Sequence, residues 1–281
     1  MNAKRKHDLE HILNATPREG PSVVKKLGIR LKIDEAEDIC RKLQRQGFDI
    51  QPYDFPGTYS VWQSNNKHGV PYSRVATKQL VQKLAEEAKI DCTTAGGFKQ
   101  LLPYFTQKTF KSKAINRWGT TLSGMFRTAY SSSPAKAIID LVENDKEFRV
   151  IQKAGIHPYD FPEAPNHYWK NNRGKPTYSA RLAAKELVKT LAVKYNADYK
   201  TLNGFLTILP YFTRETFRST EINVWGTKLG SMLSNSYGSP KSAIRDLLSK
   251  DSEFSDVAAQ LRKVAQFLPG IIPKRTSYSR L

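Results

Sequence analysis

The amino-acid sequence predicts an all-α protein made of two tandem homologous modules of four to five short helices, with a helical N-terminal cap segment. Three observations predict it. Apolar residues recur at helical spacing, and no segment shows the alternation of a half-buried strand. Residues 50–148 are repeated at residues 156–254. The length of 281 residues corresponds to about two domains, and a hydrophobic content of 39% is sufficient for packed cores.

The internal repeat consists of three matched blocks. IQPYDFP matches IHPYDFP, PYFTQKTFKSKAINRWGTTLSGMF matches PYFTRETFRSTEINVWGTKLGSML, and YSSSPAKAIIDLVENDKEF matches YGSPKSAIRDLLSKDSEF. The four tryptophans pair across the copies, Trp62 with Trp169 and Trp118 with Trp225. Solenoid repeats have periods of about 20–50 residues, so this longer period favours two small domains or one pseudo-symmetric pair.

The repeat divides the chain into four parts. They are an N-terminal helical segment (1–49), module copy 1 (50–155), module copy 2 (156–257) and a basic C-terminal tail (258–281). Helical spacing in the N-terminal segment is carried by Ala36, Ile39, Cys40 and Leu43. We interpret this segment as a degenerate half-module that caps copy 1, because terminal units of repeat arrays are often atypical. The tail carries five basic residues and no acid, and its breaks from Pro269 onwards predict a flexible end.

Each module begins with PYDFP, whose prolines predict a turn or an extended connector. After a loop, residues 72–88 form the first predicted helix, because apolar residues make a stripe at helical spacing and Ser73 is a suitable N-cap. The counterpart in copy 2 is residues 178–195. A shorter helix carries Phe98, Leu101 and Leu102, and Pro103 is expected to end it.

Three further helices are expected in the second half of each module. The predicted N-caps, given as copy 1 and copy 2 pairs, are Thr106 and Thr213, Thr120 and Thr227, and Ser133 and Ser239. Ile115 and Trp118 supply the apolar face of the first of these helices, and Gly119 and Gly226 are expected to end it. Pro134 and Pro240 lie in the first turn of the last helix, where proline is favoured.

The chain is strongly basic, with a formal net charge of +19. Such an excess can neutralise a phosphate backbone, lie on an anionic membrane or bind an acidic protein. No apolar run approaches the roughly 18 residues that span a bilayer, and the N-terminus MNAKRKHDLEHIL has no apolar core of a secretory signal. We therefore expect a cytoplasmic protein without a membrane partner, and we favour nucleic acid, DNA over RNA, as its partner.

The positive charge is concentrated in one stretch of copy 1, where no acid occurs between Asp91 and Asp140. A short helix, a glycine turn and a second capped helix within this stretch are typical of a helix-turn-helix. The candidate nucleic-acid-binding residues in copy 1 are Lys108, Lys111, Lys113, Arg117, Thr120, Thr121, Ser123 and Arg127. The candidates in copy 2 are Arg214, Arg218, Thr227 and Lys228, diluted by Glu215 and Glu221. The alternative is that this joint is only core architecture.

The loop after PYDFP is a second candidate interface. Its amide and basic side chains are Asn65, Asn66 and Lys67 in copy 1 and Asn171, Asn172, Arg173 and Lys175 in copy 2. Together with Trp62 and Trp169 this composition suits stacking on bases or reaching a groove. The alternative is that the asparagines make turns, and for the two tryptophans we favour a place in the core.

Nothing in the sequence indicates catalysis, a metal or a cofactor. None of the five histidines is matched by a histidine in the other copy, and Cys40 and Cys92 are too few for a disulfide framework or a four-cysteine zinc site. Phosphate-binding glycine loops, zincin motifs and nucleophile elbows are absent. A nuclease assembled from distant carboxylates stays open, and Asp140 and Glu143 share a helix face.

The motifs WG-T-x-L-x-x-M, Y-x-S-P-x-x-A-I-x-D-L and I-x-P-Y-D-F-P, followed by a tryptophan, resemble helical repeat modules in proteins of bacilli and their phages. The resemblance covers both copies and transfers no site residues, and the YDF of this chain stands where such modules more often carry tryptophan. It implies a bacterial, mobile-element or bacteriophage setting and an association with DNA.

These observations favour a non-enzymatic double-stranded DNA-binding protein, such as a transcriptional regulator or a nucleoid-type factor. Two alternatives stay open. One is an interaction protein whose basic surface binds an acidic protein, for example a host factor or a polymerase subunit. The other is an RNA-binding or nuclease role.

Overall fold

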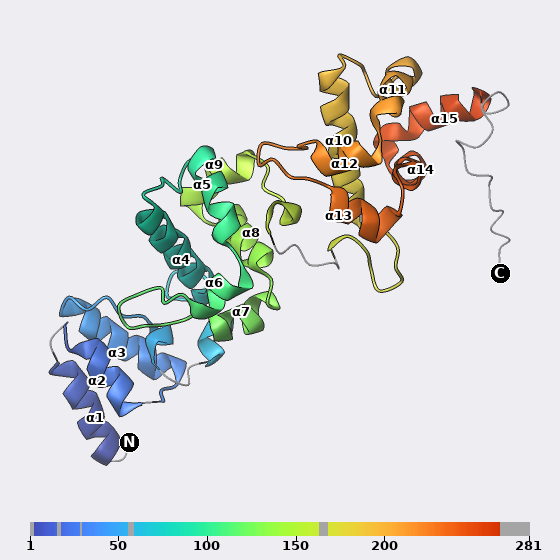
Figure 1. Cartoon of the computed structure of the whole chain (residues 1–281). Coiled ribbons are helices and arrows are strands. Elements are labelled where there is room, and N and C mark those ends of the chain that lie inside the picture. The colour runs from blue at the N-terminus through green and yellow to red at the C-terminus, as the bar shows by residue number, and fades with distance from the viewer. Residues whose placement is uncertain (1–2, 16–17, 29, 56–58, 163–167, 265–281) are drawn as a thin grey trace, which may run out of the picture. The chain divides into compact units, whose positions relative to one another are not determined.

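The structure is a computed structural model that describes residues 3–15, 18–28, 30–55, 59–162 and 168–264. Within these ranges the chain forms helices, turns and three isolated β-bridges but no β-strand, which confirms the predicted all-α class (Figure 1). The chain divides into two compact units. Unit 1 contains the described residues up to His157 together with Phe161 and Pro162, and unit 2 contains Pro158–Asp160 and residues 168–264.

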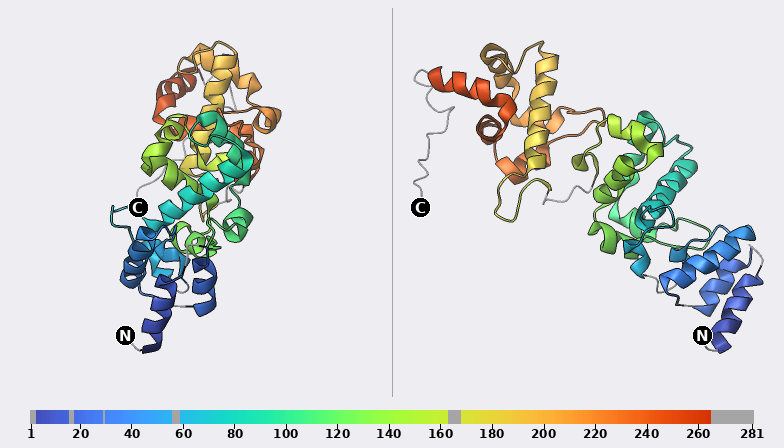
Figure 2. Two further views of the ribbon diagram at one scale, coloured as in Figure 1. Left: turned by 90° about the vertical axis from the view of Figure 1, so that its left-hand side faces the viewer. Right: turned by 180° about the vertical axis from the view of Figure 1, so that it is seen from behind.

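Unit 1 opens with α1 (Ala3–Leu13), α2 (Gly20–Leu27) and α3 (Ile33–Arg45), which Figure 2 shows gathered together. They share one apolar cluster, which includes the four α3 residues predicted from helical spacing: Ala36, Ile39, Cys40 and Leu43. Trp118 of copy 1 packs against this cluster. A Cβ on Gly20 would lie only 2.5 Å from the Phe48 ring and 2.7 Å from the Trp118 ring, so this contact requires glycine. The N-terminal helices therefore cover part of copy 1.

The other helices of unit 1 form copy 1. They are α4 (Tyr72–Ala88), α5 (Ala95–Leu101), α6 (Gln107–Ser112), α7 (Ser123–Tyr130), α8 (Pro134–Asn144) and α9 (Arg149–Lys153). Short 3-10 turns lie at Pro52–Asp54, Tyr59–Gln63, Leu102–Tyr104 and Lys146–Phe148. The long helix α4 packs against α8, and α7 packs against α6, α8 and the turn at Tyr59–Gln63.

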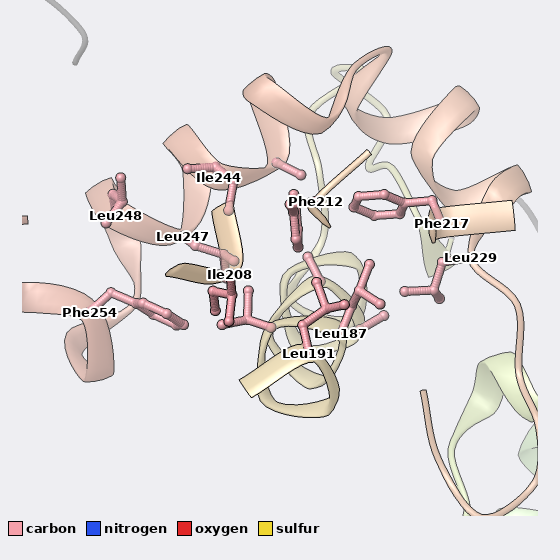
Figure 3. Close-up of a cluster of buried hydrophobic side chains, with 14 of the residues drawn as sticks. Leu187, Leu191, Ile208, Phe212, Phe217, Leu229, Ile244, Leu247, Leu248 and Phe254 are labelled. Carbon is pink, nitrogen blue, oxygen red and sulfur yellow. The ribbon is translucent and has the colours of Figure 1, made fainter. Parts of the chain in front are cut away.

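Unit 2 has a corresponding order of helices. They are α10 (Tyr178–Lys194), α11 (Leu202–Ile208), α12 (Arg214–Ser219), α13 (Gly230–Met232), α14 (Pro240–Lys250) and α15 (Ser255–Val264). The 3-10 turns are Pro158–Asp160, Leu209–Tyr211 and Ser252–Phe254, and a π-helical turn at Leu233–Tyr237 continues α13. Figure 3 shows its core, in which Leu187 and Leu191 of α10 lie among Phe212, Phe217 and Leu247.

Most of the predicted helix starts are confirmed by cap hydrogen bonds. The hydroxyls of Thr106, Thr213, Ser133 and Ser239 each accept from a backbone N–H in the first turn of the following helix. The α4 start is an exception. The helix begins at Tyr72 with Pro71 at the cap position, and Ser73 lies buried inside the first turn. The predicted cap at Ser73 is wrong because Pro71, whose φ of −56° is set by its ring, already directs the chain into the helix.

The predicted start of the C-terminal tail also needs correction. Residues 258–264 continue α15, and Ala258 and Leu261 are buried in the core of unit 2. The helix continues because Val257, Ala258 and Leu261 repeat at helical spacing and so bury one face. The predicted flexible end from Pro269 lies outside the described residues. No helix in the described ranges is both long and apolar enough to cross a membrane.

Candidate nucleic-acid interface

Two helices of copy 1 and the loop between them carry most of the cations of the acid-free stretch. The hydroxyl of Thr106 accepts from the N–H of Thr109 at 3.2 Å and starts α6. Phe110 of α6 is fully buried and stacks on Phe126 of α7, with the ring centroids 4.8 Å apart. This contact fixes the two helices side by side. Exposed on them and on the loop between them are Lys108, Lys111, Arg117, Thr121, Ser123 and Arg127, which we call the basic face.

The segment between α6 and α7 is not the turn of a helix-turn-helix. That motif joins its helices by about three or four residues, whereas residues 113–122 separate α6 from α7. Ala114 and Thr121 form an isolated bridge, and the N–H of Ile115 donates to the carbonyl of Thr120 at 2.9 Å. Gly119 has a φ of +78° and lies in the turn of this loop rather than at a helix end.

The loop is held by the carboxyl of Asp54. This carboxyl accepts hydrogen bonds from the amide of Asn116 at 2.8 Å, from the hydroxyl of Thr120, and from the N–H of Gln51 at 2.8 Å. The carbonyl oxygen of the Asn116 side chain accepts from the N–H of Trp118 at 3.1 Å. Burial raises the pKa of Asp54 to about 6, although these hydrogen bonds act in the opposite direction. PYDFP is therefore an anchor for the loop as well as a connector.

Unit 2 repeats this anchor. The carboxyl of Asp160 accepts from the amide of Asn223 at 2.6 Å and from the hydroxyl of Thr227. The N–H of Ile222 donates to the carbonyl of Thr227, and Gly226 has a φ of +77°. The predicted caps Thr120 and Thr227 are therefore wrong. Their hydroxyls serve the carboxylates, and the following helices begin at Ser123 and Gly230 without a side-chain cap.

The loop displays Arg117 at a defined position. Its guanidinium lies 6.0 Å from the ring centroid of Trp118, within reach of a cation–π contact. The indole N–H of Trp118 donates to the carbonyl of Asp49, and its ring packs on Phe48. Trp118 therefore does not belong to a helix face, as the spacing had predicted, but joins the loop to the N-terminal helices. The corresponding residue to Arg117 in copy 2 is Val224, which is 61% exposed.

Three of the predicted basic residues have hydrogen-bond or ion-pair partners within the chain, and one of them is Lys111, whose ammonium donates to the side-chain oxygen of Gln107 at 3.1 Å. Lys113 is paired with Glu87 of α4, so its charge is largely neutralised. Arg214 at the start of α12 donates to the carbonyl of Gly238 at 2.7 Å. Arg218 and Lys228 are exposed in unit 2, where Glu215 and Glu221 are exposed as well. The acids expected to dilute the charge of copy 2 are thus at its surface.

The asparagines after PYDFP build turns rather than an interface. The side-chain oxygen of Asn66 accepts from the N–H groups of His68 and Val70, and that of Asn171 accepts from Arg173 and Lys175. Both loops close with a bridge to a proline, Pro71 or Pro176. The exposed predicted residues in these loops are Asn65, Lys67, Asn171, Asn172, Arg173 and Lys175. Trp62 and Trp169 are buried and stack on Tyr53 and Tyr159, as the core interpretation predicts.

The two copies place their basic side chains differently. The loop of copy 2 exposes three cations, Lys170, Arg173 and Lys175, whereas the aligned residues of copy 1 are Asn65, His68 and Val70. This loop adjoins the helices that follow α12, because the hydroxyl of Ser236 donates to the carbonyl of Trp169 at 2.5 Å. In copy 1 the turn preceding the loop likewise packs against α7. In each copy, therefore, the loop after PYDFP or the turn before it contacts the helices that follow α6 or α12.

An internal ion-pair network, which the sequence did not reveal, engages the duplicated acids. The guanidinium of Arg74 on α4 binds Asp140 at 2.8 Å, and that of Arg181 on α10 binds Asp246 at 3.0 Å. Lys78 contacts Asp145 and Glu147, as Lys185 contacts Asp251 and Glu253. The sequence does contain a signal for this network. Arg74 and Lys78 lie one helical turn apart in copy 1, and Arg181 and Lys185 repeat that spacing in copy 2.

This network bears on whether the duplicated acids could form a nuclease site. It joins α4 to α8 in unit 1 and α10 to α14 in unit 2, and it pairs these acids with cations of the same unit. Asp140 also accepts from the hydroxyl of Tyr130 at 2.9 Å, so it acts in packing rather than as an open carboxylate beside Glu143. Among the described residues, no three His, Cys, Asp or Glu side chains are grouped so that they could hold a metal ion.

Comparisons of the chain with family models, with curated proteins and with solved structures find no match.

Proposed function

We propose that this chain is a non-enzymatic DNA-binding protein that contacts phosphates through two related helical modules of unequal charge. The relation between the modules is supported by the contacts that recur in both. Asp54 and Asp160 each anchor an asparagine and a threonine, and Arg74 and Arg181 each bind an aspartate of a later helix. Random similarity would not reproduce half-buried polar contacts in this way.

The observation that carries the proposal is the basic face of copy 1. Lys108, Lys111 and Arg127 are exposed on two helices fixed by the Phe110–Phe126 stack, and no acid occurs between Asp91 and Asp140. Exposed cations displace the counterions condensed on a phosphate backbone, which is the main source of sequence-independent DNA affinity. Because the joint between α6 and α7 is too long for a helix-turn-helix, the proposal rests on phosphate contacts and not on a groove-reading helix.

Two modules on one chain raise affinity if both engage the same DNA, because the second contact becomes intramolecular. Copy 1 contributes mainly through the basic face, and copy 2 through Arg173 and Lys175 of its loop. A double-stranded backbone offers the highest phosphate density, so duplex is the preferred form. A nucleoid-type factor or transcriptional regulator in the cytoplasm of a bacterium or a phage-infected cell fits this mode of binding.

The test is a titration of labelled duplex DNA, single-stranded DNA and RNA by fluorescence anisotropy at several salt concentrations. The wild-type chain is expected to show a steep linear loss of log affinity with log salt. In the double variant Lys111→Glu and Arg117→Glu this slope is expected to fall by about 2, since each lost phosphate contact removes about 0.9.

The matched control is Lys42→Glu with Arg45→Glu, which makes the same charge change at exposed positions of α3. Equal losses in both double variants would assign the affinity to net charge and not to the basic face. Weak duplex affinity at low salt would refute the proposal and favour an acidic protein partner. Cleavage of the nucleic acid during incubation with Mg²⁺ or Mn²⁺ would replace it with a nuclease.

A further inference from the structure

Copy 1 contains a cleft that copy 2 fills with its own side chain. The cleft has a volume of about 390 Å³ and lies between the end of α4 and the start of α6. Its lining residues include Ala88 of α4, Tyr104, and Lys108 and Lys113 of the α6 region. Small-molecule pockets in proteins are about 300–1,000 Å³, so this cleft is large enough for a small planar group.

The corresponding position in copy 2 holds a stacked pair of rings. Tyr211 aligns with Tyr104 in the matched sequence LPYFT, and Tyr195 aligns with Ala88. The rings of Tyr195 and Tyr211 lie with centroids 3.8 Å apart and an interplanar angle of 13°. In copy 1 the alanine leaves this space open, and Tyr104 is 51% exposed.

The backbones around the two tyrosines match. Each tyrosine ends a 3-10 turn, at Leu102–Tyr104 and Leu209–Tyr211, and the next residues, Phe105 and Phe212, have ψ values of 69° and 68°. The preceding long helices end alike, since Lys89 and Asn196 both have positive φ. The Tyr104 ring is therefore presented as the Tyr211 ring is, but without the aromatic partner.

The charges around the cleft indicate what replaces that partner. Lys108 is exposed at its edge, and Lys111 is exposed on the same short helix, so an anionic group attached to the ring would be attracted. Lys113 at the edge is paired with Glu87, which reduces the repulsion that this acid would exert. A nucleotide within a strand joins a planar base, through its sugar, to backbone phosphates on both sides, and stacking on tyrosine tolerates every base.

We propose that the cleft of copy 1 binds one unpaired nucleobase of DNA, stacked on Tyr104 in the place that Tyr195 occupies on Tyr211 in copy 2. Phosphates next to this base lie against Lys108 and Lys111. The site adds to the phosphate contacts that hold a duplex, so a duplex that contains an extruded base or a short single-stranded gap binds more tightly than a fully paired one. This inference rests on the proposed function, because it assumes that the basic face binds phosphates.

The test compares two labelled strands of about 12 nucleotides, an oligothymidylate and an abasic strand with the same phosphates, a length within the usual range of single-strand sites. The full-length wild type is expected to prefer the strand with bases by about 5- to 150-fold, as one stacked base contributes. The variants Ala88→Tyr and Tyr104→Ala are expected to lose this preference while their affinity for the abasic strand stays unchanged.

Ala88→Tyr places in copy 1 the residue that copy 2 already carries, without a change of charge. The control Val193→Tyr adds a tyrosine at a position of α10 that is 84% exposed and should keep the preference. Equal affinity of the wild type for both strands, or a preference that persists in Tyr104→Ala, would overturn this inference alone. Absence of binding to either strand at low salt would also overturn this inference, whereas the proposed function is overturned only by weak affinity for duplex DNA.

Discussion

Removal of the Asp54 carboxyl tests the loop anchor directly. In Asp54→Ala three donors lose their acceptor, namely the N–H of Gln51, the amide of Asn116 and the hydroxyl of Thr120. A hydrogen bond to a charged group contributes about 1.5–3 kcal/mol, and a neutral one about 1 kcal/mol. The site is only half-buried, so water can replace some of the lost hydrogen bonds. We therefore expect the unfolding free energy of unit 1 to fall by about 3 kcal/mol.

The assay is a urea titration followed by hydrogen exchange of peptides from each unit, which gives separate free energies for unit 1 and unit 2. In Asp54→Ala the loss is expected in unit 1, with the fastest added exchange in residues 113–122. The matched variant Asp160→Ala is expected to act in the same way on residues 220–229 of unit 2. Unchanged exchange of residues 113–122 in Asp54→Ala, or an equal loss in both units, would refute the assignment of Asp54 as the anchor.

Two further predictions concern the carboxyls of Asp54 and Asp246. The pKa of Asp54 is raised by burial to about 6, so its stabilising contribution is complete below its unfolded pKa of about 4 and is lost as the pH rises through 6. The unfolding free energy of unit 1 in the wild type, relative to Asp54→Asn, should therefore fall between pH 4 and pH 7, and a flat difference would contradict this. Burial alone would raise the pKa of Asp246, but hydrogen bonds from Lys250 and Arg181 outweigh it and hold that pKa below its usual value. Asp246→Ala should therefore lower the unfolding free energy of unit 2 in urea by about 3–5 kcal/mol. This loss should exceed that of unit 1 in Asp140→Ala, because the Asp246 side chain is 8% exposed and the Asp140 side chain 26%. The reverse order would show that burial of the carboxyl does not set the cost.

The sequence predicted the helices with the most regular patterns. The apolar stripe of residues 72–88 gave α4 with the bounds that the structure shows, and Ser133 and Ser239 cap α8 and α14 as expected. These features depend on residues within one or two turns of each other, so local spacing is sufficient to predict them. The error at Ser73 has the same local origin, since Pro71 and a serine both suit the start of a helix.

The candidate site was predicted in part. The exposure of Lys108, Lys111 and Arg127 agrees with the acid-free stretch of sequence. The pairing of Lys113 with Glu87 could not be predicted, because these residues are 26 positions apart and meet only when α4 packs beside α6. The cleft beside Tyr104 was missed for a similar reason. The alignment of Ala88 with Tyr195 has no meaning until the fold of each copy brings that position beside Tyr104 or Tyr211.

The sequence by itself determined the all-helical class, the positions of most caps and the matched blocks, because periodicity and capping chemistry act over a few residues. The tertiary structure alone decided the roles of the polar residues within those blocks. Thr120 and Thr227 have the chemistry of helix caps, but the carboxyls of Asp54 and Asp160, more than sixty residues earlier in each copy, bind their hydroxyls instead. A half-buried carboxyl needs donors, and packing brings the loop to it, so the long-range hydrogen bond prevails over the local cap.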